Sequence, residues 1–324
     1  MRILKSLAAI VVCSLCAAVC FCAPSYAQQW PTKPVRIVAP LAPGSGTDIL
    51  ARTLAERLSA SLGQPVIVEN RPGASTMLGA GVVAKAEPDG HTLLVTSSAH
   101  TVAPFIHGDL GFDPARDLAA VTPLATLPTV LVVPAARGYN TVHDLVAAAK
   151  AKPGSINFAS AAASTQLNAE RFRRAAGFEA VHIPFKGAPE ALNEVIAGRV
   201  DFYFSPLAPA LPHIRDGKLR ALAIGGPKRA ALLPDLPTTI EAGFPDSDYN
   251  FWIGMFVAAR TPRDIVNRLY KESVAALQLP EVRERLMRLG ADPLSMTPGE
   301  FDAYIREELK TNAVLVKQAG ITGN

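Results

Sequence analysis

Short apolar runs and longer stretches with helical periodicity alternate along most of the chain. Residues 35–39 (Val-Arg-Ile-Val-Ala) form one such run and predict a buried strand. Pro, Gly and Ser are frequent in residues 40–46 and end the strand, and Thr47 and Asp48 are good N-cap residues for the helix that follows. The apolar stripe of that helix consists of Leu50, Leu54, Leu58 and Leu62. This stretch is therefore predicted to be a strand, a glycine-containing loop and a helix.

The same alternation continues and predicts two α/β domains. Strands at residues 65–69 and 91–96, with a helix over 75–86 between them, complete the βαβαβ pattern of a parallel sheet. Residues 127–134 predict a strand that crosses into a second domain, and residues 251–259 predict a second crossing back. Between the crossings the pattern predicts strands at 155–159, 181–184, 200–204 and 219–224 and helices at 141–151, 166–176 and 187–198.

Two domains joined by two crossings make a hinged clamshell. We predict an α/β fold with domain 1 at residues 28–127 plus 251–324, domain 2 at residues 128–250, and two crossover strands at the hinge. Three amphipathic helices, over about 263–277, 280–289 and 298–319, are expected to close the chain, and the last two begin at prolines.

The first 27 residues have the features of a secretory signal peptide. Arg2 and Lys5 precede a largely apolar run, and Ser25-Tyr26-Ala27 is a small-x-small cleavage site, so we expect cleavage near Ala27 and export to the periplasm. The alternative is a retained membrane anchor, because the apolar run is nearly long enough to span a bilayer. All four cysteines lie in this segment, so the mature chain would have neither a cysteine nucleophile nor a thiolate metal site.

Composition and motifs narrow the function classes. A hydrophobic content of 49% and a charged content of 19% indicate a globular protein, and a net charge of +4 without a basic stripe argues against a nucleic-acid partner. The chain lacks a Gly-x-Ser-x-Gly elbow, a P-loop and a complete dinucleotide-binding fingerprint. The six histidines are scattered and are expected at the surface or in turns. We therefore expect no catalytic residue, no metal site and no cofactor; the competing class, an enzyme of the same architecture, would need a nucleophile or base that the pattern does not reveal.

Four loops that follow predicted strands are the candidate ligand site. Ligands of open α/β sheets bind at the carboxyl ends of strands. Residues 42–48 and 97–100 hold such positions in the first domain, and residues 160–165 and 185–187 in the second. Two of these loops lead into helices, whose free N–H groups and positive dipole ends would face each other and suit an acid with a negative group at each end. The alternative interpretation is a set of ordinary tight βα turns.

Most of the candidate ligand-binding residues in these loops are small or polar. They are Ala42, Gly44, Ser45, Gly46, Thr47, Asp48, Ser97, Ser98, Ser160, Ala162, Ser164, Thr165 and Phe185. Asp201 is a further candidate with two open interpretations: a pocket residue, or a carboxylate at a strand start that hydrogen-bonds a neighbouring turn.

The order and spacing of several motifs resemble one family. The motifs are residues 42–48 (Ala-Pro-Gly-Ser-Gly-Thr-Asp), 69–74 (Glu-Asn-Arg-Pro-Gly-Ala), 88–94 (Pro-Asp-Gly-His-Thr-Leu-Leu), 184–187 (Pro-Phe-Lys-Gly) and 233–238 (Leu-Pro-Asp-Leu-Pro-Thr). Together they resemble the periplasmic substrate-binding receptors of tripartite tricarboxylate transporters, the Bug (TctC-like) family, over essentially the whole mature chain. The resemblance implies a type II periplasmic-binding-protein fold, no catalysis, and capture of a small mono-, di- or tricarboxylate in the cleft.

The sequence departs from the family pattern at three places. Leu41 stands where an aromatic residue is common, and Ser205 where an Asp often follows the Phe; both are added to the candidate ligand-binding residues. The second loop carries alanines at 161–163 where glycines are usual, and we expect it to follow a different path because alanine resists the left-handed conformation. The expected partners are a small carboxylate and membrane transporter subunits, with a sensor kinase as the alternative, and we expect a monomer.

Overall fold

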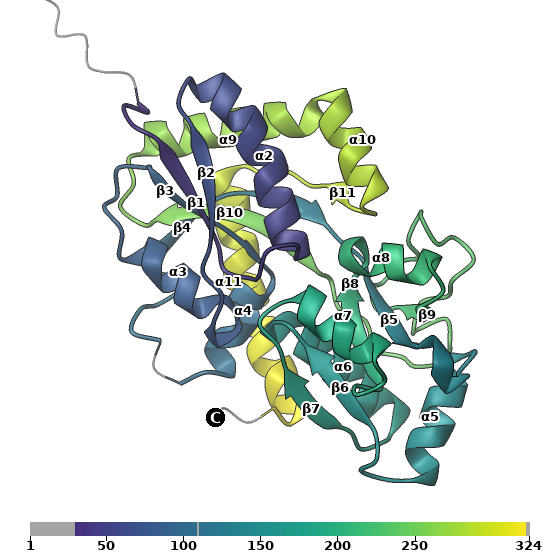
Figure 1. Ribbon diagram of the computed structural model, residues 1–324. Helices are drawn as coiled ribbons and strands as arrows, with labels where there is room; N and C mark the ends of the chain where they lie inside the picture. The colour runs from purple at the N-terminus through teal and green to yellow at the C-terminus, as the bar shows by residue number, and fades with distance from the viewer. Residues whose placement is uncertain (1–29, 109, 322–324) are drawn as a thin grey trace, which may run out of the picture. The chain divides into compact units, whose positions relative to one another are not determined.

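The computed structural model describes residues 30–108 and 110–321 (Figure 1). The chain divides into two compact units, Met1–Thr32 and Lys33–Asn324, and both β-sheets belong to the second. The predicted signal peptide, residues 1–27, lies outside the described residues. Among the helices of the described ranges, none combines the length and the apolar character needed to cross a bilayer.

Six strands form the first sheet. In spatial order they are β11 (Asp292–Pro293), β4 (Leu118–Thr126), β10 (Trp252–Ala258), β3 (Thr92–Ser97), β1 (Val35–Ala39) and β2 (Val66–Asn70). The β1 strand is parallel to β2 and β3, whereas β10 is antiparallel to both β3 and β4. The prediction from sequence missed β4 and β11. The helices that accompany this first sheet in the structure are α2 (Gly46–Leu62), η1 (Ala74–Thr76), α3 (Met77–Ala84), α4 (Ala99–Val102), η2 (Ala103–Phe105), α9 (Arg263–Gln278), α10 (Pro280–Arg288) and α11 (Pro298–Ala319).

Five strands form the second sheet. Their order is β7 (Val181–Pro184), β6 (Asn157–Ser160), β8 (Phe202–Pro206), β5 (Thr129–Pro134) and β9 (Leu219–Ile224). Helices cover both faces: η3 (Ala135–Arg137), α5 (Val142–Ala151), α6 (Ala163–Ala176), α7 (Ala188–Ile196) and α8 (Leu207–Arg215). Successive residues of β8 point to opposite faces, so Phe202 and Phe204 join one core cluster with Phe172, whereas Tyr203 joins the other with Leu192.

Apart from β11, the two sheets have the same topology, and in each the antiparallel strand next to the parallel ones comes from a connecting segment. In the first sheet, the antiparallel strand β10 comes from the part of the chain that follows the second sheet. In the second sheet, the antiparallel strand β5 comes directly after β4. The two connecting segments lie side by side, and the Leu127 N–H donates to the Phe251 carbonyl at 3.0 Å. The structure thus confirms the predicted α/β clamshell with two crossings, while the residue boundaries of the two domains remain a prediction.

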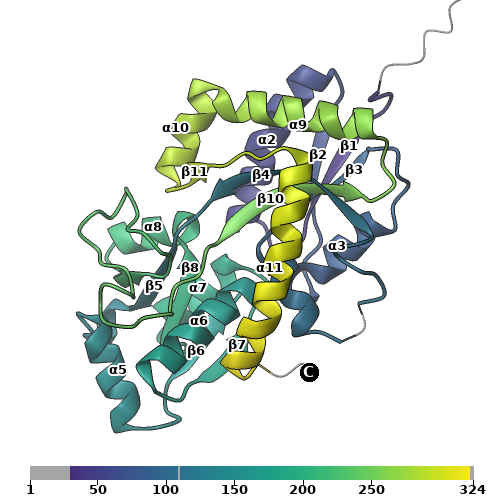
Figure 2. The ribbon, with the colours of Figure 1, turned by 180° about the vertical axis from the view of Figure 1, so that it is seen from behind.

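The C-terminal helix α11 connects the surroundings of the two sheets. It packs along β4 and α4 and, at its far end, against α6 of the second sheet (Figure 2). Both α10 and α11 begin at prolines, as the sequence predicts. The α9 helix begins at Arg263, also as predicted, whereas the predicted start of α2 needed correction. The α2 helix begins at Gly46 with Ser45 as N-cap, not with Thr47 or Asp48, and Ser45 Oγ accepts from the Asp48 N–H at 3.4 Å.

The predicted helix at 75–86 is divided into two parts. The η1 turn holds three non-glycine residues with positive φ, Ala74, Ser75 and Thr76, and α3 begins only at Met77. Such backbone conformations are costly and tend to occur at functional sites. The turn lies between β2 and α3, in the segment that carries the Glu-Asn-Arg-Pro-Gly-Ala motif.

Candidate functional site

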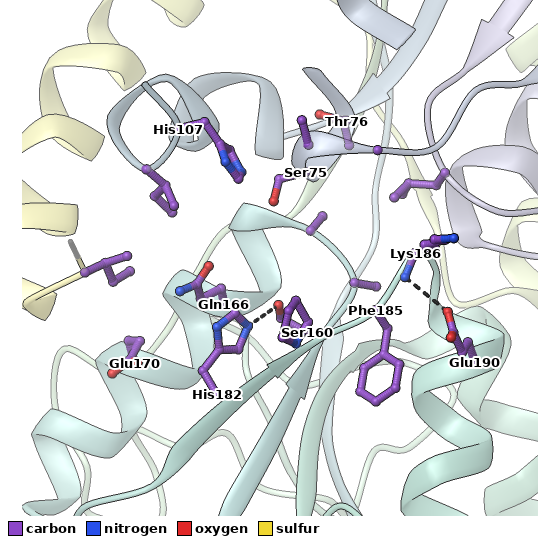
Figure 3. A pocket seen from close by; sticks show the side chains of 18 of the residues that line it. Ser75, Thr76, His107, Ser160, Gln166, Glu170, His182, Phe185, Lys186 and Glu190 are labelled. Carbon is purple, nitrogen blue, oxygen red and sulfur yellow. Dashed lines mark hydrogen bonds between the residues drawn. The ribbon is translucent and has the colours of Figure 1, made fainter. Parts of the chain in front are cut away.

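Two adjoining cavities lie between the loops of the two sheets. The inner cavity measures about 10 Å³ and lies between the N-terminal turns of α2 and α6. Its walls are formed by Leu41, Ser45, Gly46, Thr47, Ala161, Ala162, Thr165, Ala188, Tyr203, Pro206 and Phe251. The outer cavity measures about 720 Å³ and shares Leu41, Ala161 and Ala162 with the inner one (Figure 3). The two cavities therefore form the inner end and the mouth of one cleft.

Unpartnered hydroxyls line the inner cavity. Thr47, in the first turn of α2, is 1% exposed, and Tyr203, on β8, is 0% exposed. Neither the Thr47 Oγ1 nor the Tyr203 hydroxyl has a hydrogen-bond partner within the described chain, and the same holds for Ser164 Oγ in the first turn of α6. Burial raises the pKa of Tyr203 more than the nearby Thr165 and Ser205 hydroxyls lower it, so the Tyr203 hydroxyl stays a donor. Buried polar atoms are normally paired, so these hydroxyls are available to a bound acceptor.

The first turns of α2 and α6 add backbone donors. N–H groups in a helix's first turn lack a carbonyl partner inside the helix and carry the positive end of its dipole. In α6, Thr165 Oγ1 accepts from the N–H groups of Ala161 and Ala162 at 3.1 and 3.2 Å. The N–H groups that remain for a ligand are thus those of Ala163, Ser164 and Thr165, because the Gln166 N–H donates to the Ala162 carbonyl at 3.1 Å. The Ala-rich loop contains no positive φ and its N-cap, Ala162, is extended, so alanine causes no strain there.

Asp48 was predicted to bind the ligand, but its carboxylate is already occupied. It accepts from the Gly44 N–H at 2.9 Å, from Arg52 Nε at 3.0 Å and from Asn70 Nδ2 at 2.9 Å. Burial acts to raise the pKa of Asp48, but these three hydrogen bonds outweigh it, and the net pKa is lowered. Asp48 lines neither cavity. The structure assigns it to holding the 41–48 loop on α2.

Asp201 also lies outside both cavities. Its carboxylate accepts from the Asn157 N–H at 2.9 Å and forms an ion pair with Arg137 at 2.7 Å. The second of the two sequence-based interpretations therefore holds: Asp201 is a strand-start carboxylate that bonds a neighbouring segment. The prediction that it belongs to the pocket was wrong, because residues at the start of a parallel strand lie at the opposite edge of the sheet from its carboxyl end.

The other candidates divide between the cavities and their supports. Only the inner cavity is lined by Ser45, Gly46, Thr47 and Thr165, only the outer one by Ser160 and Phe185, and both by Leu41 and Ala162. Six candidates line neither: Ala42, Gly44, Ser97, Ser98, Ser164 and Ser205. Ser205 Oγ donates to its neighbour's carbonyl, that of Pro206, at 2.9 Å, and Ser97 Oγ accepts from the Ala99 N–H at 3.4 Å.

Direct contacts close the cleft on one side. The Ala42 N–H donates to the Lys186 carbonyl at 3.3 Å. A Cβ placed on Gly187 would lie 2.6 Å from Ala42 Cβ, and one on Gly44 would lie 3.4 Å from Pro189 Cγ. Ala42 and Gly44 come from the loop after β1, and Lys186, Gly187 and Pro189 come from the loop and helix after β7. These candidates therefore belong to the contact between the two sides and not to the cavity walls.

Several polar residues of the outer cavity were missed by the sequence analysis. His182, Gln166, Glu170 and Ser75 all line it. His182 Nε2 lies 2.6 Å from Ser160 Oγ. The available signal was the position of His182 within a predicted strand, two residues before the start of the Pro-Phe-Lys-Gly motif. The expectation that histidines lie at the surface or in turns was also wrong for His100, which is buried against Phe256 with ring centroids 4.7 Å apart.

In the described part of the chain, no three His, Cys, Asp or Glu side chains gather closely enough to bind a metal ion. The chemistry offered by the inner cavity is hydrogen-bond donation from hydroxyls and backbone N–H groups.

Comparison with known proteins places the chain in a family. A family model described as "Tripartite tricarboxylate transporter family receptor" matches residues 50–321. The chain belongs to this receptor family. The family's BugT protein from Bordetella pertussis (strain Tohama I) is 34% identical over 305 residues, which cover 92% of this chain and 93% of BugT. The resemblance drawn from the motifs is thereby confirmed.

Solved structures agree with this assignment. An R. palustris protein solved with adipate has a TM-score of 0.88 at 31% identity, with 91% of this chain and 100% of that chain covered. MatC from Rhodopseudomonas palustris, solved with bound malate, has a TM-score of 0.84 at 30% identity, with 89% and 100% covered. The receptor-family fold, including its two-domain clamshell, therefore extends over nearly the whole described chain.

Proposed function

We propose that this protein is a solute-binding receptor that captures a small organic acid in the cleft between its two sheets. The observation that carries the proposal is the inner cavity. There the first turns of two helices, one from each side, meet the unpartnered hydroxyls of Thr47 and Tyr203. Donors without acceptors at two positive helix ends favour a carboxylate over a cation or an apolar ligand. Relatives solved with adipate and with malate support the same ligand class.

The proposed binding residues are those of the two helix starts. Backbone N–H groups of Gly46 and Thr47 would hold the acid from one side, and those of Ser164 and Thr165 from the other. The hydroxyls of Thr47, Ser164 and Tyr203, which have no partner within the described chain, would add further hydrogen bonds. A cavity of about 10 Å³ has room for about one water molecule, so an acid requires the two sides to separate first. Hinge motion at the paired segments around Leu127 and Phe251 is the proposed route.

The proposed location and partners follow from the family. We infer that the signal peptide is removed near Ala27, that the mature chain acts in the periplasm, and that it delivers the acid to membrane transporter subunits without chemical turnover. The proposed domains remain residues 28–127 plus 251–324 and residues 128–250. Mass spectrometry of periplasmic protein tests the processing step: an intact N-terminus in the membrane fraction would contradict it.

A thermal-shift screen tests the binding proposal. The mature protein is screened against mono-, di- and tricarboxylates, with the matching methyl esters and primary amides as controls. An acid at a hundredfold excess over its Kd should stabilise the protein by about 2.7 kcal/mol. Esterification of the bound carboxylate should weaken binding at least about tenfold, because a hydrogen bond to a charged acceptor contributes about 1.5–3 kcal/mol.

The affinity of the variant Thr47→Val then tests whether the acid binds in the inner cavity. Thr141→Val is the matched control, because Thr141 caps α5 and lines neither cavity. Thr47→Val should weaken binding, whereas Thr141→Val should not. Equal binding of acids and esters would reject the carboxylate, and unchanged affinity in Thr47→Val would move the site elsewhere.

A further inference from the structure

A polar cluster from three elements forms part of the outer cavity wall. Ser160 ends β6, His182 lies on the neighbouring strand β7, and Gln166 lies on α6. Ser160 is 4% exposed, and its Oγ lies 2.6 Å from His182 Nε2. The His182 ring is also stacked on Phe158, with centroids 5.1 Å apart. Figure 3 shows Ser160, His182 and Gln166 close together on one side of the cavity. The imidazole is therefore held from two directions while it faces the cavity.

The cluster offers both donors and acceptors but no positive charge. Burial lowers the pKa of His182 to about 4, so the ring is neutral at neutral pH, with one nitrogen a donor and the other an acceptor. Because Ser160 occupies Nε2, Nδ1 remains, and it has no other partner among the residues that the structure describes. The Gln166 amide adds two donors and an acceptor. All three side chains are uncharged hydrogen-bonding groups.

The charged groups around the cluster do not favour a second carboxylate. Glu170, four residues after Gln166 on α6, lies on the same helix face and pairs with Arg173 at 2.7 Å. Glu190 also lines the cavity and accepts from the Lys186 N–H at 3.2 Å. Glu190 lies beyond Phe185, away from His182 (Figure 3). A carboxylate beside His182 would thus meet neutral partners and the carboxylate of Glu170.

Two groups of the cavity wall could carry positive charge. Lys186 is exposed, and its side chain points away from His182 (Figure 3). His107, on the first sheet's side, has its pKa lowered by burial and is therefore neutral at neutral pH. Neither is placed to neutralise an anion at the cluster, and an unpaired charge is costly to desolvate.

We propose that Ser160, His182 and Gln166 form a distal subsite that binds an uncharged hydrogen-bonding group of the ligand, such as a hydroxyl, ketone or primary amide. This inference rests on the proposed function, because the ligand's carboxylate is assigned to the inner cavity and its remainder enters the outer one. The two cavities share Leu41, Ala161 and Ala162, so one elongated molecule can occupy both. The preferred ligand is thus an acid with a neutral polar group at its far end, and not a dicarboxylate.

Three series of straight-chain acids with three to eight carbons test the subsite by calorimetry. The series are unsubstituted monocarboxylates, ω-hydroxy acids and α,ω-dicarboxylates. At the best chain length, the ω-hydroxy acid should bind about fivefold more tightly than both other acids of that length, the change expected for one hydrogen bond of about 1 kcal/mol. His182→Ala should remove this preference and leave the unsubstituted acid unaffected. His213→Ala is the matched control, since His213 lies on α8 and lines neither cavity.

Other results would overturn the proposal in distinguishable ways. A dicarboxylate that binds best, and loses that advantage in Lys186→Ala, would mean that the distal group is an anion held at the rim. A hydroxyl preference that survives in His182→Ala would place the subsite elsewhere. If none of the three series binds, the proposed function itself fails. Urea unfolding checks that each variant is folded, and if His182→Ala is not, Ser160→Ala carries the same test because it removes the partner that orients the ring.

Discussion

Gly187→Ala should weaken ligand binding because it destabilises the closed form of the cleft and not the open form. Gly187 is extended, with φ of −175°, so alanine meets no backbone strain there. A Cβ at this position would, however, lie 2.6 Å from Ala42 Cβ and 3.3 Å from the Ala42 nitrogen. Ala42 belongs to the loop after β1, on the other side of the cleft, and the atom in conflict is fixed to the backbone. The loop of residues 41–48 must therefore move when the cleft is closed, whereas an open cleft has room.

The expected size follows from the cost of overpacking. An extra methyl group forced into a packed contact costs about 1–3 kcal/mol. If the ligand-bound form is the closed one, this cost is subtracted from the binding free energy, and the apparent affinity should fall by about fivefold to about 150-fold. Gly299→Ala is the matched control, because a Cβ at Gly299 has no neighbour within 4 Å. Adding Ala42→Gly to Gly187→Ala should restore part of the affinity, because it removes the Ala42 Cβ, the atom nearest to the new methyl group.

Calorimetry with the strongest acid from the thermal-shift screen measures the affinities. Spin labels at Leu78→Cys and Val181→Cys report closure by double electron–electron resonance, because these residues are each 57% exposed and lie on α3 and β7, on opposite sides of the cleft. The described residues contain no cysteine, so labelling is specific. Gly187→Ala should shift the distances toward the open form. Wild-type affinity in this variant, with unchanged distances, would refute the assignment of the Ala42–Gly187 contact to the bound state.

Three buried polar side chains give further expected outcomes. Tyr203→Phe removes a buried hydroxyl that has no partner in the described chain. Calorimetry should therefore find the affinity for the acid at least about tenfold lower, while the free energy of unfolding is unchanged or higher. A large loss of stability would contradict this. Asp201→Asn weakens the pair with Arg137 and should lower the free energy of unfolding by about 1–3 kcal/mol in urea without changing affinity, and a change in affinity would return Asp201 to the site. Burial raises the pKa of Glu308 above its ordinary 4.5, although the Trp252 Nε1–H and two hydroxyls donate to it. The stability this contributes is present below the unfolded pKa and is lost as pH rises through the folded pKa. Urea unfolding from about pH 4 to pH 7 should therefore find the stability of wild type falling relative to Glu308→Gln, and a rising difference would refute the sign.

The sequence predicted the sheets best where strands are short, apolar and free of proline. Residues 35–39 are an example, and β1 spans the same five residues. The β4 strand was missed because it contains Pro123 and three alanines, Ala119, Ala120 and Ala125, whose strand preference is weak. In the structure, Pro123 opposes Gly254 at a register shift between β4 and β10, where a missing N–H is tolerated. Such an irregularity depends on the partner strand and cannot be seen in one segment alone.

The candidate site was predicted at the level of loops but not of contacts. The loops at 42–48 and 160–165 do meet at the inner cavity. The role of Asp48, however, depends on Asn70, which is 22 residues away, and that of Asp201 on Arg137 and Asn157. These partners are brought together by strand register, which a single sequence does not reveal. The chemistry of each carboxylate therefore became clear only from its neighbours.

The same reasoning explains why His182 was overlooked and why the Ala-rich loop is tolerated. Parallel pairing of β6 with β7 sets Phe158 opposite His182 and Ser160 opposite Pro184, which brings the histidine to the edge of the cleft. Glycine at residues 161–163 is needed only if the backbone takes positive φ, and here it does not. The backbone path is kept by the Thr165 hydroxyl, which accepts two N–H groups of that loop. Because the Thr165 hydroxyl holds this loop and the lining consists of alanines and neutral polar groups, ligand choice in this receptor should depend on the distal cluster more than on the shape of the loop.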